Sequence, residues 1–270
     1  MDTIYKSDTK RVFLTFDDGP SPVTSKILDI LKQENVKATF FILGSNVDSR
    51  KDVVKRMYEE GHYLANHGYS HTYSKIYSSP QSVLDEYNEC NDKVKNAIEV
   101  PDYNSHLFRF PGGLVGGKYA EIKKQAEVLL EQNDILHIDW NSLTGDSEKS
   151  KPTEDYLMNN LQKTTAGKNS LVVLMHDAQA KHITVETLPK VIEYLQQQGY
   201  TFKNFYEIIF VVCDKDRKPE QYQGVISKLD GILGPGKAKE IVIFTSPCTL
   251  QVILSHFGDV QLTTQAKKAA

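Results

Sequence analysis

Two adjacent carboxylates follow an apolar, β-branched run near the start of the chain. The segment Thr15–Pro20 reads TFDDGP, so Asp17 and Asp18 stand where Gly and Pro turn the chain sharply. Two carboxylates this close repel each other, and a nearby cation is the usual way to keep both ionised. The same residues also suit an ordinary turn, because Asp bonds its own backbone and Gly permits positive φ. Both interpretations, a turn and part of a metal site, are open at this point.

Two histidines four residues apart lie in the segment Asn66–His71, which reads NHGYSH. On one helical turn, His67 and His71 would share a face and could bind the same metal ion. Histidines are also common as surface or core residues without any ligand role. Together with one carboxylate, however, two imidazoles complete the three-ligand set of a hydrolytic zinc site. The combination predicts a metal centre more strongly than either motif does alone.

Two further residues could complete a catalytic site. His176 ends the apolar run LVVLMH, and a histidine there could protonate a leaving amine. Arg109, in FRFPGG, could hold a neighbouring carboxylate ionised and oriented. Each also has an ordinary interpretation, as a polar strand end and as a surface guanidinium. The glycine-rich segment Gly112–Lys118 formally matches a phosphate-binding loop, but Tyr119 stands where that motif needs Ser or Thr.

From residue 11 onward, short β-branched and aromatic runs alternate with amphipathic stretches of helical period. This alternation is typical of βα units on a parallel sheet, and about seven units can form a barrel or a doubly wound sheet. The expected strands are 11–16, 38–44, 62–66, 107–110, 135–140, 171–175 and 200–203. The expected helices lie around residues 27–31, 53–57, 83–87 and 188–195. Because the reactive residues follow successive strands, a βα barrel would gather them on one face.

The composition is that of an ordinary globular protein. The chain has 270 residues, 40% of them hydrophobic, and a net charge of −3 without any block of like charges. This balance gives no indication of a nucleic-acid partner or an anionic membrane. No apolar run is long enough to span a bilayer, and residues 1–10 carry no export signal. The three cysteines, Cys90, Cys213 and Cys248, are too scattered for a disulfide framework. The oligomeric state is not predicted.

Taken together, the motifs resemble those of the NodB-homology polysaccharide deacetylases, carbohydrate esterase family four. TFDDG, HxxxH, RxPG, a segment with Asp after a strand, and an apolar strand ending in His occur in that family's order over about residues 10–209. The resemblance implies an α/β fold, a distorted (β/α) barrel of about seven units. It also implies removal of acetyl groups from a polysaccharide with a divalent metal ion, zinc being the expected one.

The resemblance implies roles for the residues of the first three motifs. Asp17 looks like the general base that activates water. The metal ligands would be Asp18, His67 and His71. Arg109 would orient Asp17.

The resemblance also implies an acid and its partner. His176 looks like the general acid that protonates the departing amine. Asp146 would tune His176, with Asp139 as the competing assignment. The residues expected to contact substrate are Gly112, Leu174 and Trp140. Leu174 matches the residue that lines the acetyl-methyl pocket, whereas Gly112 stands where the family has Tyr, so a backbone N–H for the oxyanion remains and an aromatic wall is missing.

The resemblance leaves the substrate open between several polymers. The expected reaction is hydrolysis of N-acetyl groups on N-acetylglucosamine residues of peptidoglycan or chitin-like chains. The alternatives are an O-acetyl esterase on xylan, a hydrolase of another substrate such as a cyclic amide, and a non-catalytic carbohydrate-binding barrel. The family implies an extracellular or cell-surface location, whereas residues 1–10 show no export signal. Either an export segment is missing from this sequence, which is the favoured expectation, or the enzyme works on an intracellular or soluble oligosaccharide.

The pattern of the amino-acid sequence changes after residue 209. We expect residues 1–209 to form the deacetylase domain and residues 210–270 to be an appended α/β segment, or a fragment of another protein. FVVCDKD and FTSPCTLQVILSHF loosely resemble segments of RloB-like proteins. Asp214 and Asp216 could bind a metal ion there, although an exposed loop is the favoured interpretation.

Overall fold

The computed structural model describes residues 4–205 with their side chains, and the strands 208–212 and 240–244. The chain divides into two compact units, Met1–Lys203 and Asn204–Ala270. The division falls close to the predicted boundary after residue 209. The role of residues 210–270 stays a prediction.

The first unit is built on one parallel sheet. Its strands run in the order β5-β4-β3-β2-β1-β7-β6, and β8 pairs with β1 outside this path. The bounds are β1 (Arg11–Asp17), β2 (Thr39–Ile42), β3 (Tyr63–Asn66), β4 (Leu107–Phe108), β5 (Leu136–His137), β6 (Ser142–Leu143), β7 (Ser170–His176) and β8 (Thr201–Lys203). Parallel neighbours need crossover connections, and helices supply most of them.

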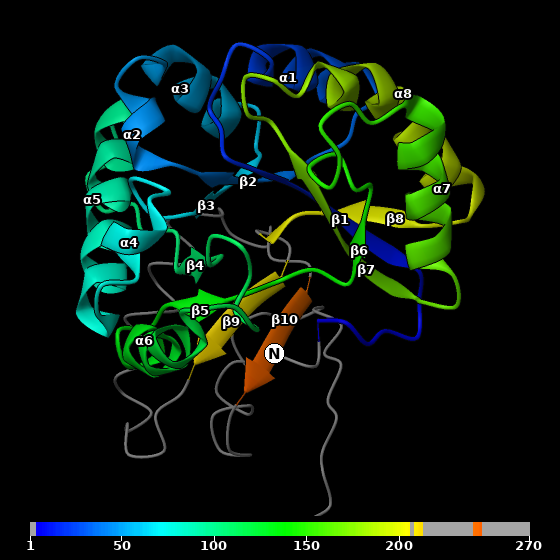
Figure 1. Cartoon of the computed structure of the whole chain (residues 1–270). Coiled ribbons are helices and arrows are strands. Elements are labelled where there is room, and N and C mark those ends of the chain that lie inside the picture. Colours follow the sequence, from blue (N-terminus) through cyan, green and yellow to red (C-terminus); the bar gives the residue numbers. More distant parts are fainter. Residues whose placement is uncertain (1–3, 206–207, 213–239, 245–270) are drawn as a thin grey trace, which may run out of the picture. The chain divides into compact units, whose positions relative to one another are not determined.

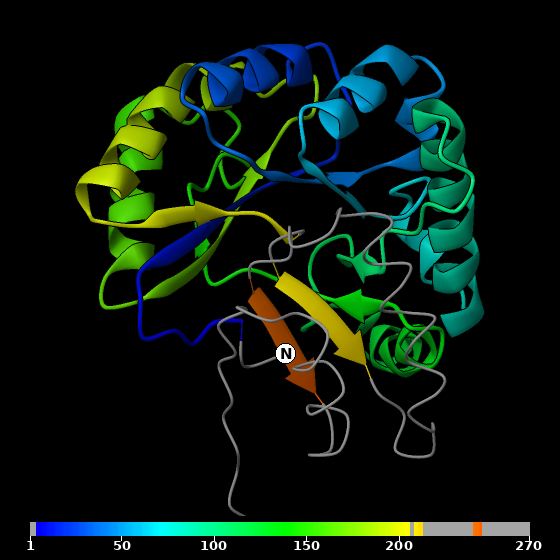
Figure 2. The same ribbon diagram turned by 180° about the vertical axis from the view of Figure 1, so that it is seen from behind.

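The sheet curls because its two edges are close in the sequence. The path ends at β5 and β6, and only residues 138–141 separate these strands. So short a connection spans at most about 17 Å, so the two edge strands must approach each other. Helices surround the outer face of the curled sheet (Figure 1), and the view from behind shows the same arrangement (Figure 2). The predicted distorted (β/α) barrel is confirmed.

The helices lie between successive strands. Their bounds are α1 (Thr24–Gln33), α2 (Gly44–Val47), α3 (Lys51–Glu59), α4 (Tyr73–Ile76), α5 (Pro80–Ile98), α6 (Ala120–Gln132), α7 (Glu154–Thr165) and α8 (His182–Gln197). Two of them begin at sequence signals that stabilise a helix start. The Ser79 side chain accepts a hydrogen bond from the Ser82 backbone N–H before α5, and Thr153 does the same for Tyr156 before α7.

The main core lies between β1 and the helices that cover it. All seven residues of β1 are buried, as expected for a central parallel strand with both faces covered. The side chains of Val12, Leu14 and Phe16 in β1 belong to one cluster with those of α1, α3 and α8. A second cluster joins α5 and α6 to Phe108 and Phe110 around β4. The strands that precede Asp17 and Arg109 are therefore each anchored in a packed cluster.

The predicted and observed elements differ in places. The expected strand 135–140 is reduced to β5, and the short strand β6, which pairs with β7, was not expected. A strand of two residues leaves no periodic pattern in a sequence. Helices α6 and α7 were also not among the expected ones. The buried face of α6 includes Lys123 and Ala126, so it does not show a regular apolar stripe.

In the second unit, the structure describes β9 (Ile208–Val212) and β10 (Glu240–Phe244), which pair in parallel. The predictions for Cys213, Asp214, Asp216 and Cys248, and most of the RloB-like segments, lie outside the described residues. Among the described residues, no helix is long and apolar enough to cross a membrane.

Candidate active site

The first carboxylate pair lies at the carboxyl end of β1. Asp17 is the last residue of the strand and is 3% exposed, and Asp18 follows with a φ of 77°. In a regular strand two consecutive side chains point to opposite faces. The left-handed conformation of Asp18, which Asp tolerates, ends that alternation. Both carboxylates consequently face His67, whose Nε2 lies 3.8 Å from Asp17 Oδ2 and 3.6 Å from Asp18 Oδ1.

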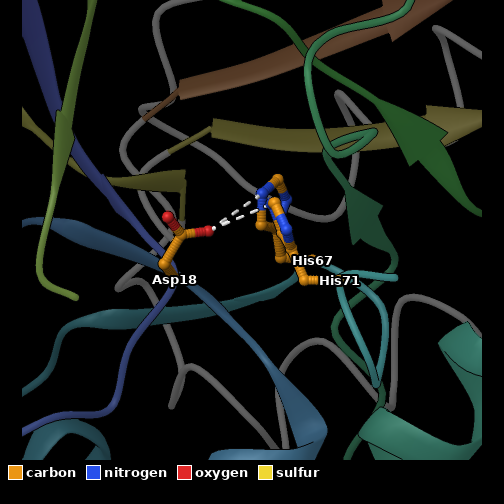
Figure 3. Close-up of side chains that lie close together, drawn as sticks. All are labelled: Asp18, His67 and His71. Carbon is orange, nitrogen blue, oxygen red and sulfur yellow. Dashed lines mark ion pairs between the residues drawn. The ribbon is translucent and has the colours of Figure 1, made fainter. Parts of the chain in front are cut away.

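The two histidines lie in a loop, not on a helix. Residues 67–71 follow β3 without helical structure, so the expected helical turn is wrong. The loop is held instead by Glu86 of α5, whose carboxylate accepts hydrogen bonds from the backbone N–H groups of Tyr69 and Ser70. This arrangement brings His71 Nε2 to 3.4 Å from Asp18 Oδ1, and Figure 3 shows both imidazoles facing that carboxylate. Hydrogen bonds to Glu86, which is distant in the chain, thus bring the two histidines together in place of the expected helical turn.

His67 is held in one tautomer. Its Nδ1 lies 2.7 Å from the carbonyl oxygen of Arg109, which can only accept, so Nδ1 carries the proton. Nε2 is therefore left with a lone pair directed at Asp18. Burial lowers the pKa of His67 to about 3, which keeps the ring neutral. A neutral imidazole oriented through its other nitrogen is the usual state of a metal-ligating histidine.

Asp18, His67 and His71 fit a divalent cation. One ligand atom from each residue lies within 4.8 Å of the others, and among the described residues this is the one such group. Asp18 Oδ1 is buried and has no hydrogen-bond partner among the described residues. A buried carboxylate oxygen without a partner is costly, whereas a cation between these atoms would satisfy it. Two imidazoles and one carboxylate also leave a position open, as in hydrolytic metal sites.

Arg109 links the carboxylate pair to the histidine loop. The surface interpretation is wrong, because its side chain is fully buried. Nη1 donates to Asp17 Oδ1 and to Thr15 Oγ1, both at 2.8 Å. Nε and Nη2 donate to the carbonyl oxygens of Ile138 and Asp139, each at 3.0 Å. One residue therefore orients Asp17 through its guanidinium and His67 through its backbone.

The carboxyl end of β7 carries a second polar pair. His176 Nδ1 lies 2.8 Å from Asp146 Oδ1, and the His176 backbone N–H donates to Asp146 Oδ2 at 2.8 Å. Thr184 of α8 donates its hydroxyl to the same Oδ2. The competing residue, Asp139, uses its carboxylate to accept from the backbone N–H of Leu114. The contact with His176 is thus made by Asp146.

The charges around these pairs shift their pKa values in different directions. Burial raises the pKa of Asp17, and although the Arg109 guanidinium and His176 lower it, the net pKa lies above its ordinary value. Burial lowers the pKa of His176, but its hydrogen bond to Asp146 and the negative charges of Asp146 and Asp17 reverse the sign, and the net pKa is raised. Burial raises the pKa of Asp146, and the contact with His176 outweighs it, so that pKa falls. His176 is consequently stabilised as the cation.

The residues expected to contact substrate lie around Arg109 and β7. Leu174 belongs to β7 and is 8% exposed. Trp140 has its ring centroid 5.7 Å from the Arg109 guanidinium carbon. Gly112 has a φ of 76°. Its backbone N–H makes no hydrogen bond within residues 4–205, so it is available to an oxyanion. The contacts of these residues with a substrate stay predictions.

The family model of the polysaccharide deacetylases matches residues 5–130, which include Asp17, Asp18, His67, His71 and Arg109. A putative polysaccharide deacetylase of Bacillus subtilis, YheN, is 36% identical over 197 residues, 72% of this chain and 66% of the relative. A peptidoglycan-N-acetylglucosamine deacetylase of Bacillus cereus is 32% identical over 74% of this chain and 71% of its own length. The chain belongs to the polysaccharide deacetylase family.

The solved structures agree with this family. A CE4 esterase of Streptococcus mutans is 34% identical and superposes with a TM-score of 0.69, over 75% of this chain and 90% of that one. Two other relatives are much longer than this chain. The chain covers 30% of a bifunctional xylanase/deacetylase of Pseudobutyrivibrio xylanivorans and 39% of a peptidoglycan-N-acetylglucosamine deacetylase of Listeria monocytogenes. The family resemblance inferred from the motifs is confirmed.

Two residues of this deacetylase that the motif analysis did not select also lie at the site. Asp177, directly after His176, is fully buried, and its Oδ2 accepts from Thr24 Oγ1 at 2.6 Å. Burial raises the pKa of Asp177 to about 7. Its position after a buried strand, like that of Asp18, was a signal for it in the sequence. Tyr73 reaches the space beside Gly112, and no local pattern could have shown this.

Proposed function

We propose that this chain is a metal-dependent deacetylase that hydrolyses N-acetyl groups on N-acetylglucosamine residues of peptidoglycan or chitin-like chains. Residues 1–209 are proposed as the catalytic domain and residues 210–270 as an appended segment. The observation that carries this proposal is the arrangement of two pairs around one group of ligands. The pairs Asp17–Arg109 and His176–Asp146 flank the group Asp18, His67 and His71, which we call the metal-type cluster. The substrate is supported by the relatives, one of which is named a peptidoglycan-N-acetylglucosamine deacetylase.

Asp18, His67 and His71 would hold the divalent cation, which we propose to be zinc. When bound, such a cation lowers the pKa of a coordinated water and polarises the acetyl carbonyl group. The neutral state and fixed tautomer of His67 favour this ligand set.

Asp17 is proposed as the general base that takes a proton from the attacking water. The Arg109 guanidinium holds the Asp17 carboxylate through a hydrogen bond to Oδ1, which leaves Oδ2 for the water. The positive charge of Arg109 also opposes the effect of burial on the pKa of Asp17, and so favours the ionised form that a base requires.

His176 is proposed as the general acid. As the carbon–nitrogen bond of the amide breaks, the imidazolium gives its proton to the departing amine, which stays on the sugar, and acetate is the other product. Asp146 keeps His176 oriented and raises its pKa, which favours the protonated form that an acid requires. The backbone N–H of Gly112 would donate to the carbonyl oxygen while that oxygen gains negative charge.

The pair formed by His176 and Asp146 favours an N-acetyl substrate over the O-acetyl groups of xylan. An amine is a poor leaving group unless it is protonated, whereas an alkoxide leaves more readily. A buried carboxylate that raises the pKa of His176 supplies what amide hydrolysis needs most. A purely carbohydrate-binding role would not explain why the base, the acid and the cluster are all present. A peptidoglycan substrate would place the enzyme at the cell surface.

The test is acetate release from N-acetylglucosamine oligomers by the full chain after metal removal and after reloading with zinc. We expect acetate only with metal, and a loss of about 10²–10⁴-fold or more in the variant Asp17→Asn. The matched control is Asp102→Asn, because Asp102 is exposed, and it should keep full activity. Acetate release that persists without metal, or in Asp17→Asn, would contradict the proposed mechanism. Release from acetylated xylan alone would move the assignment to the O-acetyl esterases.

A further inference from the structure

Tyr73 is an exposed aromatic residue beside the metal-type cluster. It begins α4, two residues after His71, and its side chain is one of three large exposed hydrophobic ones in residues 4–205, at 40% exposure. Its ring centroid lies 5.6 Å from that of the His71 imidazole. An exposed aromatic residue in contact with a proposed ligand has a face available to a bound molecule.

The ring of Tyr73 is supported from behind. It packs edge to face on Tyr77 with centroids 5.6 Å apart, and Tyr119 lies 6.5 Å away. Tyr77 is fully buried and donates its hydroxyl to the carbonyl oxygen of Pro111 at 2.7 Å. The support of Tyr73 is thereby tied to the residue directly before Gly112. Tyr73 is consequently held in position by its aromatic neighbours and forms one wall of the site.

The hydroxyl of Tyr73 occupies the place of a side chain at position 112. A Cβ atom on Gly112 would lie only 2.5 Å from Tyr73 Oη, and the φ of 76° already disfavours any residue with a side chain. The Tyr73 hydroxyl makes no hydrogen bond to another residue in the described part of the chain. A tyrosine hydroxyl can both donate and accept, so this one is free to bond a ligand.

We propose that Tyr73 positions the glycan substrate. Its hydroxyl hydrogen-bonds a polar group of the sugar next to the scissile acetyl group, and its ring forms the aromatic wall that Gly112 cannot supply. The inference rests on the proposed function, since it assigns a substrate-binding role within the same site. It differs from that function in concerning affinity for the sugar and not the chemistry of hydrolysis.

The test compares Tyr73→Phe, Tyr73→Ala and the control Tyr156→Phe. Tyr156 lies on α7, and its hydroxyl donates to the Glu148 carboxylate. The measurements are kcat and KM on N-acetylglucosamine oligomers, and bound zinc per chain. We expect Tyr73→Phe to raise KM about 3- to 10-fold with kcat changed less than about twofold, as for loss of one hydrogen bond. Tyr73→Ala should raise KM further, and all three variants should bind zinc like the wild type.

Binding without turnover separates this inference from the proposed function. The dissociation constant of a tetramer of N-acetylglucosamine is measured in the Asp17→Asn background, with and without Tyr73→Ala. Acetate release by the wild type with unchanged KM and binding in the Tyr73 variants would overturn the inference and leave the proposed function standing. No acetate release together with weaker binding on loss of Tyr73 would overturn the proposed function and retain Tyr73 as a glycan contact. If neither release nor binding responds, both are wrong.

Discussion

The carboxyl ends of β1 and β7 are neighbours in the sheet, yet they hold their reactive groups in opposite ways. Asp17 and His176 are paired in the register of these strands. Asp17 is a carboxylate held by an arginine, which stays protonated at any ordinary pH. His176 is an imidazole held by a carboxylate, so both members of that pair can titrate. We infer that loss of the charge in the first pair mainly lowers the stability of the fold. Loss of the charge in the second pair mainly changes the pH dependence of activity.

The strongest test of this contrast is removal of the fixed charge. The variant Arg109→Met leaves the buried carboxylate of Asp17 without its cation and leaves two backbone carbonyl groups without a donor. We expect a loss of about 3–5 kcal/mol in the free energy of unfolding, because an unpaired buried charge is very costly. Chemical denaturation, followed by circular dichroism, measures this.

The matched control for Arg109 is Arg56→Met. Arg56 pairs with Asp29 and Glu60 near the surface, where an ion pair contributes about 0–1 kcal/mol. Equal losses in the two variants would show that burial of Arg109 does not set its importance, and the contrast between the two strand ends would fail.

The next test concerns the titrating pair. In Asp146→Asn the shape of the partner is kept but its negative charge is lost, so the pKa of His176 should fall. The protonated acid then disappears at lower pH, and the alkaline limb of the kcat profile should move toward acid. We also expect kcat at its maximum to fall about 10²–10⁴-fold, as for loss of an oriented acid.

The control for Asp146 is Asp155→Asn, which removes an exposed charge from the start of α7. Its pH profile should overlay that of the wild type. A profile of Asp146→Asn that keeps the alkaline limb of the wild type would mean that His176 is not the group whose protonation limits the rate.

The smallest expected effect lies one contact further from the reaction. Thr184 donates its hydroxyl to Asp146 Oδ2 at 2.8 Å, and Thr184→Val removes this bond at nearly constant volume. We expect a loss of about 1–2 kcal/mol in stability and a fall in kcat of less than about fivefold, because the bond between Asp146 and His176 remains. Urea unfolding and acetate release measure the two quantities.

Thr187 provides the control for Thr184 on the same helix. It is equally buried, but its hydroxyl has no hydrogen-bond partner among the described residues. Thr187→Val should therefore be neutral or slightly stabilising, since it removes an unsatisfied polar group. A larger loss for Thr187→Val than for Thr184→Val would show that packing in α8, and not the bond to Asp146, governs the effect.

Much of the site was visible in the sequence because its residues follow elements with strong patterns. The buried run 11–16 predicted β1, and the two carboxylates directly after it could only lie at the end of that strand. The apolar residues of α1, α3 and α8 repeat at helical spacing, and they do form the main core. These features are local, because each depends on residues within a single strand or helix.

Only the tertiary structure showed that Asp146, and not Asp139, contacts His176. It also held the His67–His71 loop through Glu86 and placed Tyr73 in the space beside Gly112. Each of these depends on hydrogen bonds or contacts between residues that are distant in the chain, and in one case on a strand of only two residues. Such contacts leave no periodicity, since any segment of suitable length could bring a side chain to the same place. The sequence by itself therefore determined which groups stand at the strand ends, whereas the packing of loops and helices determined which of those groups touch.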